Sequence, residues 1–261
     1  GRICAVGDRA VHVFDRAGAG VATWSLAGPG YCVAVSPQDR VYVGQAERIE
    51  VFDAAGELIE TWRDARRLGL VTAIGFSQGI TLAADARGRC IRRLGPHGEY
   101  QGDIGNDNKM RGFQIPNGIV DFSVDDAGTI HAANPGRHRI GRYDVTGKLL
   151  GHFGRFDGRS PAGFAGCCNP TNVTVAGNGW TYVTEKAGPR AKVYDAENEF
   201  RAVIADDVFE PGCKNMDIVV AADGRVYVTD TVRLTILIFE PVPAAHVQPA
   251  AAATPVEANT P

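Results

Sequence analysis

Short apolar runs separated by polar turns extend along most of the chain. The most regular run usually ends in an acidic residue, as in Val51-Phe52-Asp53 and Val193-Tyr194-Asp195. It recurs at intervals of about 38 to 51 residues, which suits repeated four-stranded units. Its copies are residues 13–15, 51–53, 93–95, 142–144, 193–195 and 238–240.

A second set of short apolar runs supports the same repeat. Each follows a turn built from Gly, Asp or Asn, such as Asp126-Ala127-Gly128 or Asp223-Gly224, and these residues supply the positive φ that tight hairpins need. Repeats of this length with four short strands are typical of a β-propeller, in which each repeat is one blade. The chain is therefore predicted to be all-β, with residues 1–243 forming a six-bladed propeller.

Both ends of the repeat array are expected to be incomplete. The first copy begins at the strand that is second in the other copies, and the last copy, residues 216–240, stops after its third strand. Pro241 cannot donate to a strand ladder, so the residues that follow do not make a good fourth strand. We expect incomplete first and last blades and imperfect closure between them.

Composition narrows the class of partner. The 261 residues are 44% hydrophobic, and 27 basic against 30 acidic residues give a net charge of −3. This balance does not favour nucleic acid or an anionic membrane surface, and no apolar run is long enough for a transmembrane helix. Residues 244–261 are rich in Pro, Ala and Thr and predict a disordered tail. Such tails are common on exported proteins, so we expect a periplasmic or secreted protein whose leader has been removed.

Counting back from the turn glycines aligns polar residues at the start of the innermost strands. Asp121, Asn172 and Asp217 each lie seven residues before such a glycine. Cys32 and Thr72 take the same place in earlier repeats. The alignment predicts a polar ring around the axial channel. The ring either solvates a water-filled channel or supplies oxygen ligands to Ca²⁺ or Mg²⁺.

A group of cysteines is predicted at the mouth of this channel. Asn117, Cys168 and Cys213 each lie eleven residues before a turn glycine, and Cys167 adjoins Cys168. Three thiolates suit a metal ion or an iron–sulfur cluster, with Cys32, a carboxylate or solvent as fourth ligand. A disulfide joining the two loops and free buried thiols are the alternatives, and the spacing does not choose between them.

The repeats resemble those of the NHL family. The resemblance rests on residues 170–175 with 179–185, and on residues 216–230, and the pattern covers most of residues 1–240. The phrases Gly166-Cys167-Cys168-Asn169-Pro170 and Pro211-Gly212-Cys213-Lys214-Asn215 are further similar to a bacterial, exported NHL subgroup. Membership implies a six-bladed propeller but no particular reaction, because this fold serves binding proteins and enzymes alike.

Two functions of different class follow from these patterns. The favoured one is a non-enzymatic propeller that binds a protein or small-molecule ligand on the loop face, where the connections between consecutive blades gather, with a cysteine site that is structural or metal-bearing. The alternative is a metal-dependent hydrolase, lactonase or lyase that uses the axial polar ring. Residues Ile115-Pro116-Asn117-Gly118 resemble the Pro-Asn-Gly of the gluconolactonase group, and Ca²⁺ is the less favoured cofactor.

Overall fold

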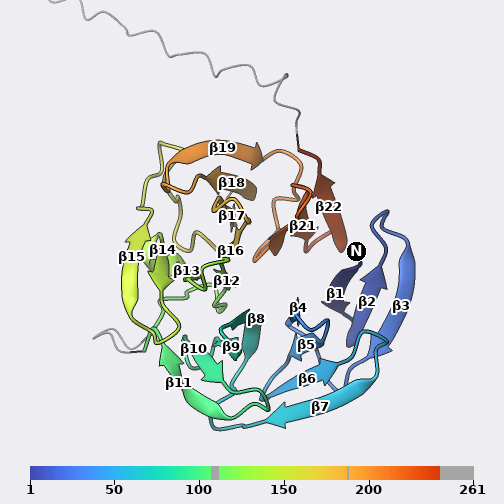
Figure 1. The fold of residues 1–261 in the computed structure, drawn as a ribbon. Helices are drawn as coiled ribbons and strands as arrows, with labels where there is room; N and C mark the ends of the chain where they lie inside the picture. Colours follow the sequence, from blue (N-terminus) through green and yellow to red (C-terminus); the bar gives the residue numbers. More distant parts are fainter. Residues whose placement is uncertain (107–111, 187, 242–261) are drawn as a thin grey trace, which may run out of the picture.

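The computed structural model describes residues 1–106, 112–186 and 188–241, and in them the chain forms six antiparallel sheets around one axis (Figure 1). This confirms the predicted all-β, six-bladed propeller. In the described residues no helix is long and apolar enough to cross a membrane. The tail predicted at residues 244–261 lies outside the described residues.

The blades follow one another in chain order. The first three contain β1 (Ile3–Gly7), β2 (Ala10–Phe14) and β3 (Gly20–Ser25); β4 (Cys32–Val35), β5 (Val41–Gly44), β6 (Arg48–Phe52) and β7 (Leu58–Arg63); β8 (Val71–Ser77), β9 (Ile80–Asp85), β10 (Cys90–Leu94) and β11 (Tyr100–Ile104). The last three contain β12 (Phe122–Val124), β13 (Ile130–Asn134), the 3-10 helix η1 (Pro135–Arg137), β14 (Arg139–Tyr143) and β15 (Leu149–Phe153); β16 (Asn172–Val175), β17 (Thr181–Glu185), β18 (Arg190–Tyr194) and β19 (Phe200–Ala205); β20 (Ile218–Val220), β21 (Val226–Asp230) and β22 (Thr235–Phe239).

The first and last blades each have three strands in the described residues, as predicted, whereas the other four have four. The strands β4, β8, β12, β16 and β20 are innermost in their blades (Figure 1). In the first blade β1 is innermost, although its sequence matches the second strand of the other repeats. Within residues 1–106, 112–186 and 188–241, the first blade therefore has no counterpart of the innermost strand of the pattern, and the last has none of the outermost one.

The repeated aspartate after each third strand is explained by the turn that follows it. Asp53 Oδ1 accepts hydrogen bonds from the backbone N–H groups of Ala55 and Glu57, each at 2.9 Å. This side-chain turn reverses the chain into the outermost strand. The same acceptor geometry recurs at Asp15 and Asp144, so the acidic position read from the sequence is a turn residue.

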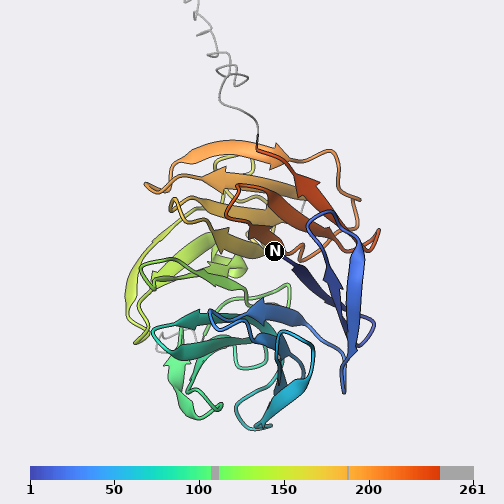
Figure 2. The same cartoon turned by 45° about the vertical axis from the view of Figure 1, so that its right-hand side comes forward.

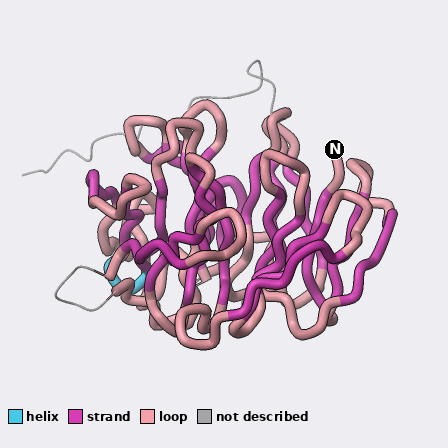
Figure 3. Tube along the Cα trace, turned by 60° about the horizontal axis from the view of Figure 1, so that its bottom comes forward, coloured by secondary structure: helices cyan, strands magenta, loops and turns pink. Residues whose placement is uncertain are grey.

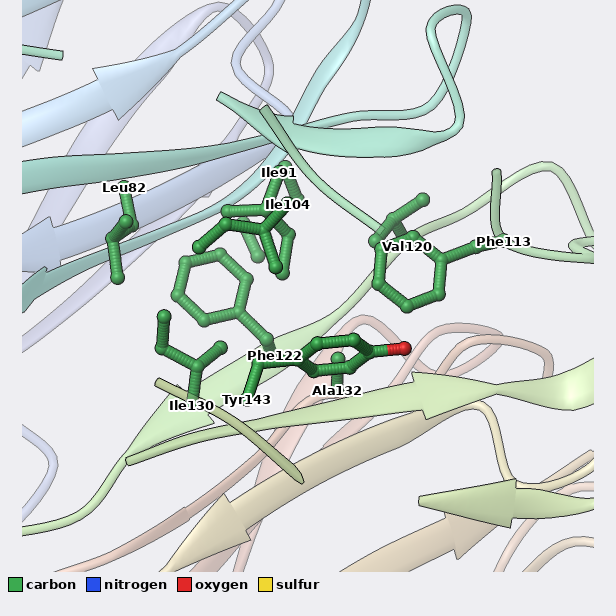
Figure 4. Packing of buried hydrophobic residues seen from close by; sticks show 11 residues of the cluster. Leu82, Ile91, Ile104, Phe113, Val120, Phe122, Ile130, Ala132 and Tyr143 are labelled. Atoms are coloured by element: carbon green, nitrogen blue, oxygen red, sulfur yellow. The ribbon is translucent and has the colours of Figure 1, made fainter. Parts of the chain in front are cut away.

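The apolar core lies between the blades rather than on the axis. Five buried clusters each join two consecutive blades. In the cluster between the third and fourth blades, Leu82 and Ile91 face Phe122 and Ile130 (Figure 4). Each sheet is thus buried by its neighbours, and burial of this kind is the main favourable contribution to folding.

The seam between the last and first blades is different. Within the described residues no buried apolar cluster crosses it. Its hydrogen-bonded contacts are an ion pair between Arg16 and Asp223 and a bond from Arg225 Nη1 to Arg16 O at 3.5 Å, all near the surface. We call these residues the closing seam; β22 and the start of the chain border it (Figures 1 and 2).

The connections between strands gather at the two ends of the blades, and η1 lies at one of them (Figure 3). Hydrogen bonds between backbone groups link several connections on that face, including Phe113 N to Arg89 O at 2.8 Å and Gly136 N to Gln114 O at 2.7 Å. This face carries the long connections before β12, β16 and β20, and it is the loop face expected from the sequence.

The unequal seams predict unequal local stability. Amide protons in β1 and β22 are expected to exchange with solvent at least about tenfold faster than those in β9 and β13, because local opening at the closing seam exposes no buried cluster. Native-state hydrogen exchange followed by mass spectrometry measures this. Equal protection in all six blades would contradict the prediction.

Candidate functional site

Five residues predicted to lie seven positions before a turn glycine, or before the residue in its place, are found in or directly before the innermost strands; Asn117, also predicted for the polar ring, lies in the connection before β12. Cys32 and Asn172 are the first residues of β4 and β16, and Thr72 lies in β8. Asp121 and Asp217 come directly before β12 and β20. They occupy corresponding places because Ala133 N donates to Asp121 O, and Thr229 N donates to Asp217 O. The structure therefore arranges all five around the axis.

Several of these side chains bind the backbone of the next blade. Cys32 Sγ donates to Val71 O at 3.6 Å, and Thr72 Oγ1 donates to Val120 O at 2.7 Å. In the following blade the direction reverses, because Asp121 Oδ2 accepts from Val173 N at 2.7 Å. Each bond crosses one seam, so the polar ring links consecutive blades.

The linkage ends in the last two blades. Asn172 Oδ1 is buried and has no hydrogen-bond partner among the described residues. Asp217 Oδ1 accepts from Ile218 N, its own neighbour, at 2.9 Å. The blade that follows Asp217 in the ring is the first one, in which β1 is innermost and matches the second strand of the other repeats. Asn172 and Asp217 thus leave polar groups available at the axis.

Burial and mutual repulsion govern the charge of the ring. The pKa of Asp121 is raised well above its ordinary value, first by burial and then by Asp217, despite the N–H of Val173. Surrounding protein atoms that displace part of the water around Asp217 also raise its pKa, against the N–H of Ile218. The effect is greatest at Asp121, which is 6% exposed, whereas Asp217 keeps access to solvent. Burial likewise raises the pKa of the Cys32 thiol. The ring therefore favours protonated, neutral groups.

The fit of a metal ion to these residues is poor. In the described parts of the chain, no group of three or more His, Cys, Asp or Glu side chains is arranged to hold one. Calcium prefers several ionised oxygen ligands, whereas burial raises the pKa of Asp121 and so opposes its ionisation. Neither the axial ring nor the cysteines offer the set expected for Ca²⁺, Mg²⁺ or an iron–sulfur cluster.

The residues predicted at the channel mouth are not held together as one group. Asn117 Nδ2 donates to Asn215 Oδ1 at 3.1 Å, which joins the connections before β12 and β20. The sulfurs of Cys167 and Cys168 are 2.8 Å apart. Cys213 is buried elsewhere and its Sγ donates to Asp230 Oδ1 at 3.1 Å. All six cysteines are free, so no disulfide joins the two loops.

A second set of polar residues, which the sequence analysis missed, lies where the second strands end. Asp85 Oδ1 accepts from Leu70 N at 3.1 Å, and Asn134 Oδ1 accepts from Gln114 N at 3.0 Å. Asp230 Oδ2 likewise accepts from Glu210 N at 3.5 Å, so in these three blades the acceptor holds the incoming connection on the loop face. The set comprises Gln45, Asp85, Asn134, Glu185 and Asp230, all buried. The sequence feature that could have revealed this set is an acidic or amide residue at or directly after the end of the second strand in these five repeats.

The connection that carries Cys167 and Cys168 is held by a buried lysine of β18. Lys192 is fully buried, and its Nζ donates to Pro161 O at 2.9 Å and to Gly163 O at 2.6 Å. The ammonium group also lies 3.0 Å from Glu185 Oε1 and above the ring of Phe164. These contacts compensate a buried charge and hold the loop in one place.

A pocket of about 400 Å³ opens on the loop face. It joins connections from the third, fourth and fifth blades. Its lining residues are Arg89, Gln114, Ile115, Pro116, Gly136 and Cys167. This volume falls in the range of small-molecule sites.

Solved structures of similar fold include enzymes. A streptogramin B lyase matches with a TM-score of 0.62 at 14% identity, over 87% of this chain and 72% of that one. A virginiamycin B lyase from Staphylococcus aureus gives 0.59 at 14% identity, over 91% and 83%. A protein of unknown function from Bacteroides caccae gives 0.60 at 13%, over 80% and 79%. Neither a protein-family model nor a curated protein matches the chain. At such identities the likeness shows the propeller fold alone.

The raised pKa of Asp121 predicts a pH-dependent stability difference. Between the ordinary aspartate pKa of about 3.9 and its raised folded value, the folded protein holds the extra proton. The resulting stabilisation is complete below about pH 4 and is lost as pH rises through the folded pKa. Asp121→Asn keeps an acceptor for Val173 N–H but cannot ionise. Relative to wild type, it should gain about 1.4 kcal/mol of unfolding free energy per unit of pKa elevation as pH rises to 7.

Urea denaturation of both proteins at a series of pH values measures this difference. Asp206→Asn, in an exposed connection, is the matched control because it removes the same charge without burial. A difference between Asp121→Asn and wild type that stays constant from about pH 4 to 7 would refute the buried protonated carboxyl.

Proposed function

We propose that this chain is an NHL-type propeller that binds a small anionic organic ligand in the loop-face pocket. The observation that carries the proposal is the pocket itself, about 400 Å³ in volume, with Arg89 as the charged residue of its lining. A guanidinium group recognises carboxylate or phosphate with paired hydrogen bonds. Ile115 and Pro116 supply apolar surface beside it.

The walls of the pocket are fixed, which favours binding. Phe113 N donates to Arg89 O, and Gly136 N donates to Gln114 O. The buried Asn134 accepts from Gln114 N. These bonds tie together segments from two blades, so little ordering is required when a ligand enters. The periplasmic or secreted location expected from the sequence is part of this proposal and agrees with a ligand-binding role.

Ligand-observed NMR with a library of small carboxylates and phosphate esters tests the pocket. Compounds that bind wild-type protein are expected to lose about tenfold or more in affinity to Arg89→Ala, because a charge-assisted hydrogen bond is removed. Arg63→Ala is the matched control, since Arg63 lines a separate groove of about 260 Å³. Equal losses in both variants, or no binding by wild type, would overturn the proposal.

The axial ring supports a second candidate, acid–base lyase or hydrolase chemistry. Asp121 is a buried carboxyl whose pKa is raised by burial and by Asp217, and Asp217 itself is accessible to solvent. Two carboxyl groups whose environments differ are a common basis for general acid and general base roles. The lyases of similar fold make this candidate worth a direct test.

Quinupristin, the compound named with a solved virginiamycin B lyase, is the first substrate to try. Liquid chromatography after incubation with wild-type protein should show conversion if the axial ring is catalytic. Asp121→Asn should then reduce the rate by about 100-fold or more, the usual contribution of a general acid. Absence of conversion rejects this substrate, and equal rates in the variant reject the role of Asp121.

A further inference from the structure

Two consecutive thiols face each other in the connection between β15 and β16. Cys167 Sγ and Cys168 Sγ are 2.8 Å apart, and both cysteines are free. Cys167 is exposed, whereas Cys168 is only 3% exposed. One sulfur of the pair is therefore accessible to a ligand and the other is shielded.

The surroundings hold the shielded thiol in place. Burial and the hydrogen bond with Cys167 raise the pKa of Cys168, and the nearby Lys186 opposes them. Lys186 is itself positioned, because its backbone N–H donates to Asn169 Oδ1 at 2.9 Å. Asn169 Nδ2 in turn donates to Ala165 O at 2.8 Å. The pair thus sits on a fixed loop beside a cation that stabilises thiolate as it forms.

The accessible thiol belongs to the loop-face pocket. Cys167 lines the pocket together with Arg89. A ligand whose anionic group binds the guanidinium is therefore held in the pocket that this sulfur also lines. The other cysteines have no such access: Cys90 is fully buried, and burial raises its pKa to about 12.

We propose that Cys167 and Cys168 form a dithiol couple that reduces a small, carboxylate-bearing organic disulfide in the loop-face pocket. This proposal rests on the proposed ligand site and names its substrate class. It assigns the attacking role to Cys167, the accessible thiol, and the resolving role to Cys168.

The reaction balances in two exchange steps. The Cys167 thiolate attacks one sulfur of the disulfide R–S–S–R, a mixed disulfide forms, and one thiolate RS⁻ leaves. The Cys168 thiolate then attacks Cys167 Sγ and expels the second RS⁻. Two cysteine thiols are oxidised to one disulfide, two RS groups are reduced, and the two protons lost by the cysteines end on the two RSH products.

Oxidised glutathione serves as the anionic probe and 2-hydroxyethyl disulfide as the neutral one. Wild-type protein should lose two titratable thiols and release two equivalents of thiol per chain. Cys168→Ser should stop at a mixed disulfide on Cys167, seen by intact-protein mass spectrometry. Cys167→Ser should not react, and Cys4→Ser, which alters a thiol outside the pocket, should behave as wild type.

Arg89→Ala separates this proposal from that of the ligand site. It should slow the reaction with oxidised glutathione by about tenfold and leave the reaction with 2-hydroxyethyl disulfide unchanged. If both disulfides react equally well in wild type and in Arg89→Ala, the dithiol chemistry stands and the anionic pocket fails. If Cys167 and Cys168 stay reduced with both probes while carboxylates still bind, the redox proposal is overturned and the pocket remains.

Discussion

Every blade of this propeller is stabilised by packing an apolar face against at least one neighbouring blade. An isolated blade would expose two partly apolar faces to water and would lose the favourable free energy that their burial contributes. Five seams provide this burial with apolar clusters, and the polar ring adds bonds from side chains of one innermost strand to the backbone of the next. Among the residues that the structure describes, the closing seam has neither, and its contacts lie near the surface, such as that of Arg16 with Asp223. The ring of blades is therefore held together unevenly, by buried apolar contacts at five seams and by surface contacts at the sixth.

The repeat made the fold and the ring predictable because both are set by local rules. Aspartates such as Asp53 and Asp144 form their turns with residues two and four positions later, so their spacing marks strand ends wherever they occur. Once the strand register is fixed, residues that are equally many positions from the turn in different repeats lie at the same level along the propeller axis. Asp121 and Asp217 accordingly come directly before β12 and β20. The same repeat pattern predicted that the first and last blades would have three strands in the part of the chain that the structure describes.

The fate of the cysteines was not predictable in this way. Equal spacing places Cys168 and Cys213 at corresponding points of different blades, which does not bring them into contact. What each sulfur meets depends on how its loop folds, and that is decided by distant residues. Asp230, at the end of β21, takes the Cys213 thiol, and Lys192, in β18, holds the loop below Cys168. The strand-end acceptors also recur in the sequence, as a polar residue at the end of each second strand. The alignment on turn glycines considered only the innermost strands and so did not include them.

Those strand-end acceptors have a consequence for how such a protein changes over time. One buried side chain, such as Asp85 or Asn134, receives the incoming connection through a backbone N–H, a group that every residue except proline possesses. The acceptor imposes almost nothing on the side chains of the connection it holds. Loops of different length and chemistry can therefore replace one another on the same scaffold while the strands beneath stay constant. In a propeller of this design, the strands that set the fold and the loops that set binding specificity can therefore evolve independently.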